Sequence, residues 1–141
     1  MKKIAQGNIV IIGCGHLGAL VATSLSNAGG TVTVIDRDKN SFAKLSPSFG
    51  GLTIVGNATD IDVLAEAGIS PKTTVVCATN HGNTNIMAAQ MAKVLFSAKR
   101  VIARLYNPEK AFVYEEEGVE TICPDDLAAQ EIFDRINEGL A

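Results

Sequence analysis

The sequence predicts an α/β protein whose single domain is a doubly wound, six-stranded parallel sheet in the strand order 3-2-1-4-5-6. Three observations predict it: short continuous apolar runs, apolar residues at helical spacing between those runs, and a glycine-rich turn after the first run. Strands of a parallel sheet are covered on both faces, so they read as continuous apolar runs. A chain of 141 residues suits one domain of ordinary size.

The first half of the chain predicts three strands, each followed by a helix. The apolar run at residues 8–12 leads through the glycine turn into a helix whose apolar residues recur from Leu17 to Ala28, and Gly29 and Gly30 end that helix. The other elements of this half are strands over residues 31–35 and 52–55, a short helix over 41–46 before Pro47, and a helix from Asp60 to Ala67.

The second half repeats this alternation. After a strand over residues 73–78 and a polar turn over 79–83, apolar residues mark a helix from Ile86 to Leu95. The remaining elements are a strand over residues 101–105, a helix over 108–117, a strand over 119–123 and a last helix over 125–139. Strands that alternate with helices indicate a parallel sheet with right-handed crossovers.

Charge and cysteine content exclude several classes of protein. The formal charge is −3, but residues 1–108 carry 10 Lys and Arg against 5 Asp and Glu, whereas residues 109–141 carry 2 against 10. The basic residues are scattered and aromatic residues are few, so no nucleic-acid partner is predicted. Three cysteines without ligand spacing argue against a disulfide scaffold or a zinc site. No apolar run is long enough to cross a bilayer and no secretory signal is evident, so we expect a cytoplasmic protein.

The residues Gly13-Cys14-Gly15-His16-Leu17-Gly18 form a GxGxxG motif between the first predicted strand and the first predicted helix. In such a Rossmann-like turn, Gly13 permits a tight turn, Gly15 lets a diphosphate approach, and Gly18 lets the helix pack on the strand. Backbone N–H groups at the start of the helix then point at the anion. Cys14 lies at the same helix start, where the pKa of a thiol can fall, although a small side chain is also what the turn admits.

Asp36 ends the second predicted strand, where its carboxylate can accept hydrogen bonds from both hydroxyls of a ribose. A carboxylate at this place repels a 2′-phosphate. The sequence therefore favours the adenosine of NAD, ATP or ADP over NADP, although the neighbouring Arg37 weakens that exclusion.

Polar residues also follow the third strand, at the edge where open α/β sheets bind ligands. In Gly56-Asn57-Ala58-Thr59-Asp60, the amide of Asn57 is placed to read an edge of adenine, whereas Asp60 favours a helix cap.

The segment Ala78-Thr79-Asn80-His81 follows the fourth strand and is expected to line the far side of the cleft. Asn80 and Asn85 are equally consistent with ligand contact and with turn formation or helix capping. His81 favours a solvated loop residue over a catalytic base. Arg104 lies in the fifth strand, where a guanidinium needs a carboxylate or a ligand phosphate, and we expect it to act in the cleft.

Together these residues resemble the N-terminal nucleotide-binding domain of Trk/Ktr potassium-transport regulatory subunits, also called the RCK or TrkA-N domain. The resemblance covers almost the whole chain, so residues 1–141 are interpreted as one such domain. It implies a domain at the inner face of the cell membrane that binds NAD or NADH, or ATP, ADP or AMP. It also implies dimers or larger rings that pass the nucleotide state to the gate of a potassium channel or transporter.

The resemblance implies roles for single positions as well. Residues 13–18 would hold the phosphates and Asp36 the ribose, and Asn57 with Ala58 would hold the adenine. The rest of the cleft would come from Ala78, Thr79, Asn80 and Arg104.

Two features limit what the resemblance implies. Many ATP-binding members carry Arg where this chain has His16, so a preference for ATP over ADP, AMP or NAD does not follow. Many members also have a second ligand-binding domain, so a chain that stops at Ala141 is either a single-domain member or part of a longer one. In some members an acid near the position of Asp125 helps to bind a divalent cation, which makes Asp125 the one metal candidate.

The last predicted helix has an apolar face broader than one sheet edge requires, with Leu127, Ala129, Ile132, Phe133, Ile136 and Leu140. Surplus apolar surface of this kind favours another chain as its partner, so we expect a homodimer, a larger ring or an assembly with a second regulatory chain. Packing on the sheet of its own chain is the alternative.

Two function classes remain. A dehydrogenase needs groups that hold and polarise a substrate beside the nicotinamide, and the only imidazoles of the chain are His16 and His81. A regulatory binding module needs only a difference in affinity between two assembly states. We therefore expect a nucleotide sensor that is not an enzyme. A small NAD-dependent oxidoreductase, or a cofactor-binding fragment of one, is the alternative.

Overall fold

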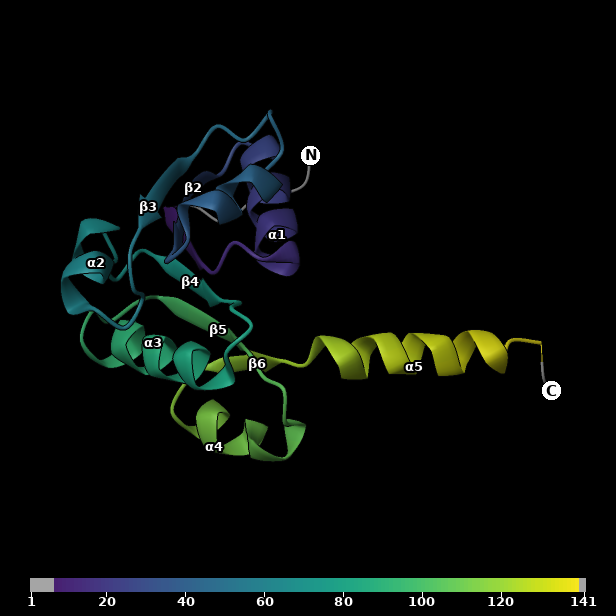
Figure 1. The fold of residues 1–141 in the computed structure, drawn as a ribbon. Coiled ribbons are helices and arrows are strands. Elements are labelled where there is room, and N and C mark those ends of the chain that lie inside the picture. The colour runs from purple at the N-terminus through teal and green to yellow at the C-terminus, as the bar shows by residue number, and fades with distance from the viewer. Residues whose placement is uncertain (1–6, 140–141) are drawn as a thin grey trace.

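The computed structural model describes residues 7–139 and confirms the predicted sheet. Six parallel strands lie in the order β3-β2-β1-β4-β5-β6 (Figure 1). They are β1 (Asn8–Ile12), β2 (Thr31–Asp36), β3 (Leu52–Val55), β4 (Thr74–Cys77), β5 (Arg100–Arg104) and β6 (Glu120–Ile122). The strands predicted at residues 8–12 and 52–55 coincide with β1 and β3. The strand predicted at 31–35 differs from β2 by one residue at one end, and the other three differ by one residue at each end.

Helices cover both faces of the sheet, as the alternating pattern predicts. On one face, α1 (His16–Asn27) and the 3-10 helix η1 (Lys39–Lys44) pack over β1 and β2. The other face carries α2 (Ile61–Glu66), α3 (Gly82–Val94) and α4 (Ala111–Glu116). The described chain is completed by a short 3-10 helix, η2 (Pro108–Lys110), and by α5 (Pro124–Ile136).

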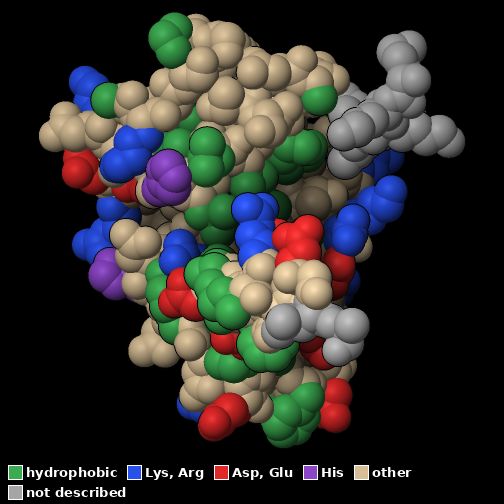
Figure 2. Space-filling model, turned by 90° about the vertical axis from the view of Figure 1, so that its right-hand side faces the viewer, with side chains coloured by type: hydrophobic (Ala, Val, Ile, Leu, Met, Phe, Trp, Pro, Cys, Tyr) green, Lys and Arg blue, Asp and Glu red, His purple; other side chains and the backbone are tan. Residues whose placement is uncertain are grey.

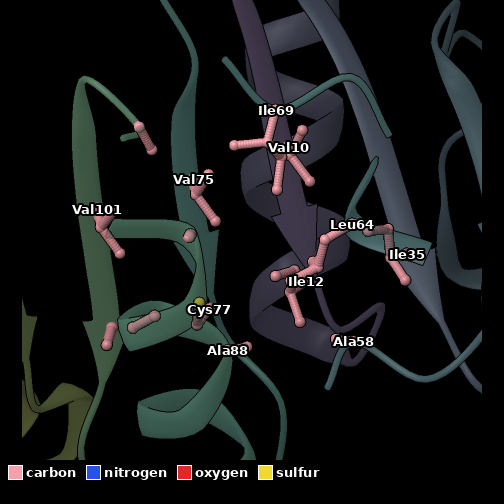
Figure 3. Packing of buried hydrophobic residues seen from close by; sticks show 14 of the residues in the cluster. Val10, Ile12, Ile35, Ala58, Leu64, Ile69, Val75, Cys77, Ala88 and Val101 are labelled. Carbon is pink, nitrogen blue, oxygen red and sulfur yellow. The ribbon is translucent and has the colours of Figure 1, made fainter. Parts of the chain in front are cut away.

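The core is built on alternate residues of the central strands. Val10 and Ile12 of β1 lie in a cluster with Val75 and Cys77 of β4, on the side of α2 and α3 (Figure 3). Ile11 of β1 belongs to the cluster on the opposite face, under α1. Strand β1 is therefore fixed from both faces, and the glycine turn that follows it starts from a rigid base.

Helix α3 begins earlier than the sequence predicts. Its first turn, residues 82–85, holds no apolar side chain, so the periodicity located the helix only from Ile86. The polar turn after β4 consequently ends at His81, the residue before the helix. The short helix predicted over residues 41–46 is the 3-10 helix η1, which begins two residues earlier, and the one predicted over 108–117 is η2 followed by α4.

Helix α5 extends away from the body of the molecule (Figure 1). None of its residues is buried, and Phe133 and Ile136 are 62% and 73% exposed, so the alternative in which this helix packs on its own sheet is wrong. Its apolar residues also share a narrower face than predicted. Ala129, Ile132, Phe133 and Ile136 follow the i, i+3, i+4, i+7 spacing of one face, whereas Leu127 lies on the opposite side. Leu140, the last residue predicted for this face, lies outside the described residues.

None of the helices within residues 7–139 is both long and apolar enough to traverse a bilayer.

Candidate functional site

A cleft of about 350 Å³ opens at the carboxyl edge of the sheet, where the loops after β1, β2, β3 and β4 meet. Figure 2 looks onto this edge, with α5 directed toward the viewer. The size is typical of small-molecule sites. Half of the predicted binding residues line it, namely Gly13, Gly15, Asp36, Arg37, Gly56, Ala58, Thr79 and Asn80.

The glycine turn after β1 is shaped by close backbone approaches. Gly13 has a φ of +100°, and a Cβ there would lie 2.8 Å from the backbone nitrogen of Thr79 in the loop after β4. A Cβ on Gly18 would overlap the carbonyl oxygen of Gly13. Two of the three glycines of the motif are thus required by packing within the protein.

Gly15 is different, because its missing side chain leaves open space. The nearest atom to a Cβ at this position would be Oδ1 of Asn80, 3.9 Å away, and Gly15 lines the cleft. Gly15 is also the N-cap residue of α1, and no side chain caps the first turn of that helix. Free N–H groups and the positive end of the helix dipole therefore face the cleft, an arrangement that suits a phosphate.

The carboxylate of Asp36 is held in place by two backbone amides. Its Oδ2 accepts a hydrogen bond of 2.8 Å from the N–H of Cys14, and its Oδ1 accepts one of 2.8 Å from the N–H of Asp38. Each oxygen keeps a further lone pair, so the carboxylate can still accept from the two hydroxyls of a ribose. Asp36 thus links the glycine turn to the loop after β2 and presents a fixed acceptor to the cleft.

Comparison with known proteins identifies the family of this domain. The model of the TrkA-N domain matches residues 9–124. This chain belongs to the TrkA-N domain family.

Two relatives extend the match along the chain. A Trk system potassium uptake protein TrkA from Streptomyces coelicolor is 40% identical over 129 residues, which are 92% of this chain and 58% of the relative. A TrkA homologue from Pyrococcus horikoshii is 34% identical over 131 residues, which are 89% of this chain and 58% of the relative. The chain therefore spans somewhat more than half the length of these relatives.

Solved structures confirm the TrkA-N fold. The TrkA-N domain of the inner membrane protein ybaL from Escherichia coli superposes with a TM-score of 0.78 at 16% identity, over 90% of this chain and 94% of that one. A Kef C-terminal domain from Shewanella denitrificans in AMP-bound form gives 0.70 at 18% identity, over 96% and 84%. The GsuK channel bound to NAD gives 0.68 at 17% identity, over 86% and 22%.

In this TrkA-N domain, some residues of the loop after β3 line the cleft, and others stabilise the loop itself or the start of α2. Gly56 and Ala58 line the cleft, whereas Asn57 does not. The Oδ1 of Asn57 accepts from the backbone N–H and the hydroxyl of Thr59, at 2.9 and 2.8 Å, which leaves its Nδ2 for a ligand. Asp60 caps α2 by accepting from the N–H of Asp62, as the sequence favoured.

Asn85 is fully buried and does not line the cleft. Its Oδ1 accepts from the backbone N–H and the hydroxyl of Thr79, at 2.8 and 2.7 Å, and its Nδ2 donates to the carbonyl oxygens of Thr79 and Arg104. With these bonds the amide has no free donor or acceptor of ordinary geometry left. In the described structure Asn85 therefore positions the loop after β4 against the end of β5, behind the wall of the cleft.

Arg104 also lies outside the cleft. Its guanidinium stacks 4.8 Å from the centre of the Tyr106 ring, and its Nε is buried without a hydrogen-bond partner. The hydroxyl of Tyr106 donates to the carbonyl oxygen of Thr79 at 3.3 Å. The aromatic ring of Tyr106 partly takes the place of the carboxylate or phosphate expected beside this cation, and no sequence motif marks Tyr106.

The thiol of Cys14 is buried under α1, away from the cleft. Burial raises its pKa, and the Asp36 carboxylate raises it further, while the Lys44 ammonium partly opposes the rise. The pKa of this thiol is thus raised and not lowered, and Cys14 fits the interpretation of a small side chain that the turn admits.

The other predicted positions are peripheral. His16 is exposed, Leu17 is half-buried and Ala78 is buried, and none of them lines the cleft. Asp125 is exposed in the first turn of α5, and no group of three or more His, Cys, Asp or Glu residues suited to a metal occurs within residues 7–139.

Sequence reasoning missed part of the cleft wall. Asp38, Ser41 and Lys44 reach it from the segment after β2, and Thr84 reaches it from the first turn of α3. These residues belong to no motif, and only the fold brings them to the edge. His81 also lines the cleft and is exposed, as expected of a loop residue.

Proposed function

We propose that this TrkA-N domain is a nucleotide-sensing regulatory subunit, or the sensing part of one, for a potassium channel or transporter. The observation that carries the proposal is the cleft between the uncapped start of α1 and the fixed carboxylate of Asp36. The names of the relatives, Trk system potassium uptake proteins, support the potassium link. We place its site of action at the inner face of the cell membrane, beside a membrane-embedded partner.

The ligand is an adenine nucleotide, either NAD or NADH or one of ATP, ADP and AMP. Proteins of the same fold have been solved with NAD, ADP or AMP bound, which supports this range. The free amides at the start of α1 would meet its phosphates and Asp36 its ribose. The loop at Gly56 and Ala58 would take the base, and Thr79 and Asn80 would close the far side.

The proposed activity is binding and not catalysis. Asp36 and Asp38 line the cleft, but their carboxylates accept hydrogen bonds from backbone amides and hold the loop in shape. A ligand bound in this way acts by stabilising one arrangement of the assembly over another. A tenfold higher affinity for one arrangement corresponds to about 1.4 kcal/mol per site.

The exposed apolar face of α5 is proposed to hold the assembly together. Ile132, Phe133 and Ile136 lie on one side of a helix that leaves the body at the same edge as the cleft (Figure 1). A second copy presents the same face, so two helices can cover each other in a symmetric dimer, which larger rings or a second regulatory chain could extend.

Thermal unfolding with NAD, NADH, ATP, ADP and AMP tests the binding proposal. A ligand present at a hundred times its Kd adds about 2.7 kcal/mol to the free energy of unfolding, which raises the melting temperature measurably. No shift with any of the five compounds would contradict the proposal. Turnover of a nicotinamide dinucleotide with an alcohol or hydroxy acid would instead support a small oxidoreductase.

The potassium link has a separate test in the source organism. Cells that lack this chain are expected to take up potassium more slowly at limiting external potassium. The intact chain should restore uptake, whereas the Asp36→Asn variant should not. Uptake that is unchanged by deletion would refute the link and leave nucleotide binding standing.

A further inference from the structure

Part of the wall of the cleft is formed by the 3-10 helix η1. Ser41 and Lys44 of this helix line the cleft together with Gly13 and Gly15. The neighbouring residues Phe42 and Leu45 pack against the core under α1. This packing anchors η1, so the Lys44 side chain is carried on a fixed support.

The charge of Lys44 has no acidic partner in the described structure. The ion pairs within residues 7–139 join Arg100 to Glu120 and Arg135 to Glu131, and both lie outside the cleft. The two carboxylates that line the cleft are engaged elsewhere. Those of Asp36 and Asp38 accept from backbone amides, at 2.8 and 2.9 Å.

Lys44 also lies close to the glycine turn. Its ammonium group partly opposes the rise in the pKa of the Cys14 thiol that burial and the Asp36 carboxylate cause. Cys14 is the residue between Gly13 and Gly15, and both of these glycines line the cleft together with Lys44. The Lys44 cation and the uncapped start of α1 therefore both favour an anion in this cleft, beside the carboxylate of Asp36.

We propose that Lys44 binds a phosphate of the ligand opposite the glycine-turn amides, and so makes the site selective for adenine nucleotides over the uncharged nucleoside. This assignment rests on the proposed nucleotide-binding function and adds a determinant of ligand charge to it. In this assignment Asp36 binds the ribose, whereas Lys44 binds a phosphate and so favours ligands that carry negative charge.

Calorimetry on the full chain with adenosine, AMP and ADP tests the assignment. Lys44→Gln is expected to weaken ADP binding about tenfold or more, the usual effect of losing one hydrogen bond to a charged group, and to leave adenosine binding unchanged. Lys44→Arg should keep most of the ADP affinity. The matched control is Lys39→Gln, since Lys39 is exposed on the same helix and does not line the cleft.

The outcomes separate the two proposals. An equal loss for adenosine and ADP, or no loss for ADP, would overturn the role of Lys44 and leave the binding function intact. Failure of the unsubstituted chain to bind any of the three compounds would overturn both.

Lysine acetylation gives a second readout that needs no variant. With an amine-reactive acetylating reagent and peptide mass spectrometry, ADP should slow the modification of Lys44 several-fold and leave Lys39 unaffected. Adenosine should protect neither lysine. Equal rates at Lys44 with and without saturating ADP would contradict the contact.

Discussion

At the scale of single residues, Asp36 joins three segments of the cleft. Its carboxylate accepts from Cys14 and Asp38, and its carbonyl oxygen accepts from the N–H of Gly56 at the end of β3. One residue therefore ties the glycine turn to the loops after β2 and β3 on the other side of the cleft. Its removal should affect binding of every ligand that carries a ribose.

In the variant Asp36→Asn, an amide NH2 group replaces one of the two carboxylate oxygens. One of the two backbone N–H groups, of Cys14 or of Asp38, then loses its acceptor. We expect the affinity for adenosine, AMP and ADP to fall by a similar factor of about ten or more, measured by calorimetry. A loss confined to the phosphorylated compounds would contradict the ribose assignment. Asp62→Asn, at an exposed site in α2, is the control and should bind as the unsubstituted chain does.

Asn85 predicts a stability effect. Asn85→Ala leaves the N–H of Thr79 and the carbonyl of Arg104 without their partners in a buried place, which should lower the free energy of unfolding by about 3 kcal/mol. Denaturant unfolding measures the change. Asn83→Ala, at an exposed position in the same turn of α3, should cost less than about 0.5 kcal/mol. Equal effects of the two variants would refute the assignment.

The cysteines predict a pattern of chemical labelling. Burial raises the pKa of Cys77 to about 12, and the pKa of Cys14 is raised as well, so at pH 8 both remain protonated and shielded. The thiolate is the reactive form of cysteine. The reactivity of Cys14 and Cys77 therefore rises only when the pH comes close to their raised pKa values. Iodoacetamide at pH 8 should label the half-buried Cys123 first, as read by peptide mass spectrometry. Labelling of Cys14 ahead of Cys123 would contradict this order.

Residues within a motif were predictable from the sequence, and residues outside one were not. Asp36, Gly13 and Gly15 stand at fixed places relative to a strand and a helix, so their position in the cleft follows from spacing. Lys44 and Tyr106 belong to no such pattern, and only tertiary packing brings them to this edge. Asn85 was left undecided, because an asparagine in a first helical turn has the same sequence signature whether it contacts a ligand or a loop.

At the scale of elements, two glycines of the turn after β1 are expected to matter for different reasons, Gly15 for ligand binding and Gly18 for folding. Gly15 has a φ of −82° and open space beside it, so Gly15→Ala should leave the melting temperature almost unchanged while its methyl group intrudes where a phosphate would lie. In Gly18→Ala, the added Cβ meets the carbonyl of Gly13, so both the melting temperature and nucleotide affinity should fall. Comparable losses of melting temperature in the two variants would contradict this division.

Element types were predictable because hydrophobic periodicity reports burial on the chain's own core. That signal is absent from the polar first turn of α3, and the start of this helix was therefore missed. In α5 the apolar signal is present, but it does not say what covers the apolar face. Its apolar spacing is the same whether it covers its own sheet or another chain, so periodicity could indicate the helix but not its partner.

At the scale of the whole molecule, α5 predicts the oligomeric state. Phe133→Asp puts a charge in the middle of the exposed apolar face and should convert the proposed dimer into monomers, as measured by sedimentation velocity. Leu127→Asp is the matched control, because Leu127 is similarly exposed on the opposite side of the helix and its change should leave the dimer intact. Deletion of residues 125–141 should likewise give a monomeric or aggregating protein. A protein that stays dimeric after this deletion would refute the role of α5.

The place where α5 leaves the body has a mechanical consequence. The helix has 13 residues, so its far end lies about 20 Å from its root at β6, on the edge where the cleft also opens. Rotating its root by about 10° would move its far end by roughly 3 Å, which is about the donor–acceptor distance of a hydrogen bond. If a bound ligand turned this root, the helix would act as a lever arm and would enlarge a small adjustment at the cleft before it reached a partner bound to α5.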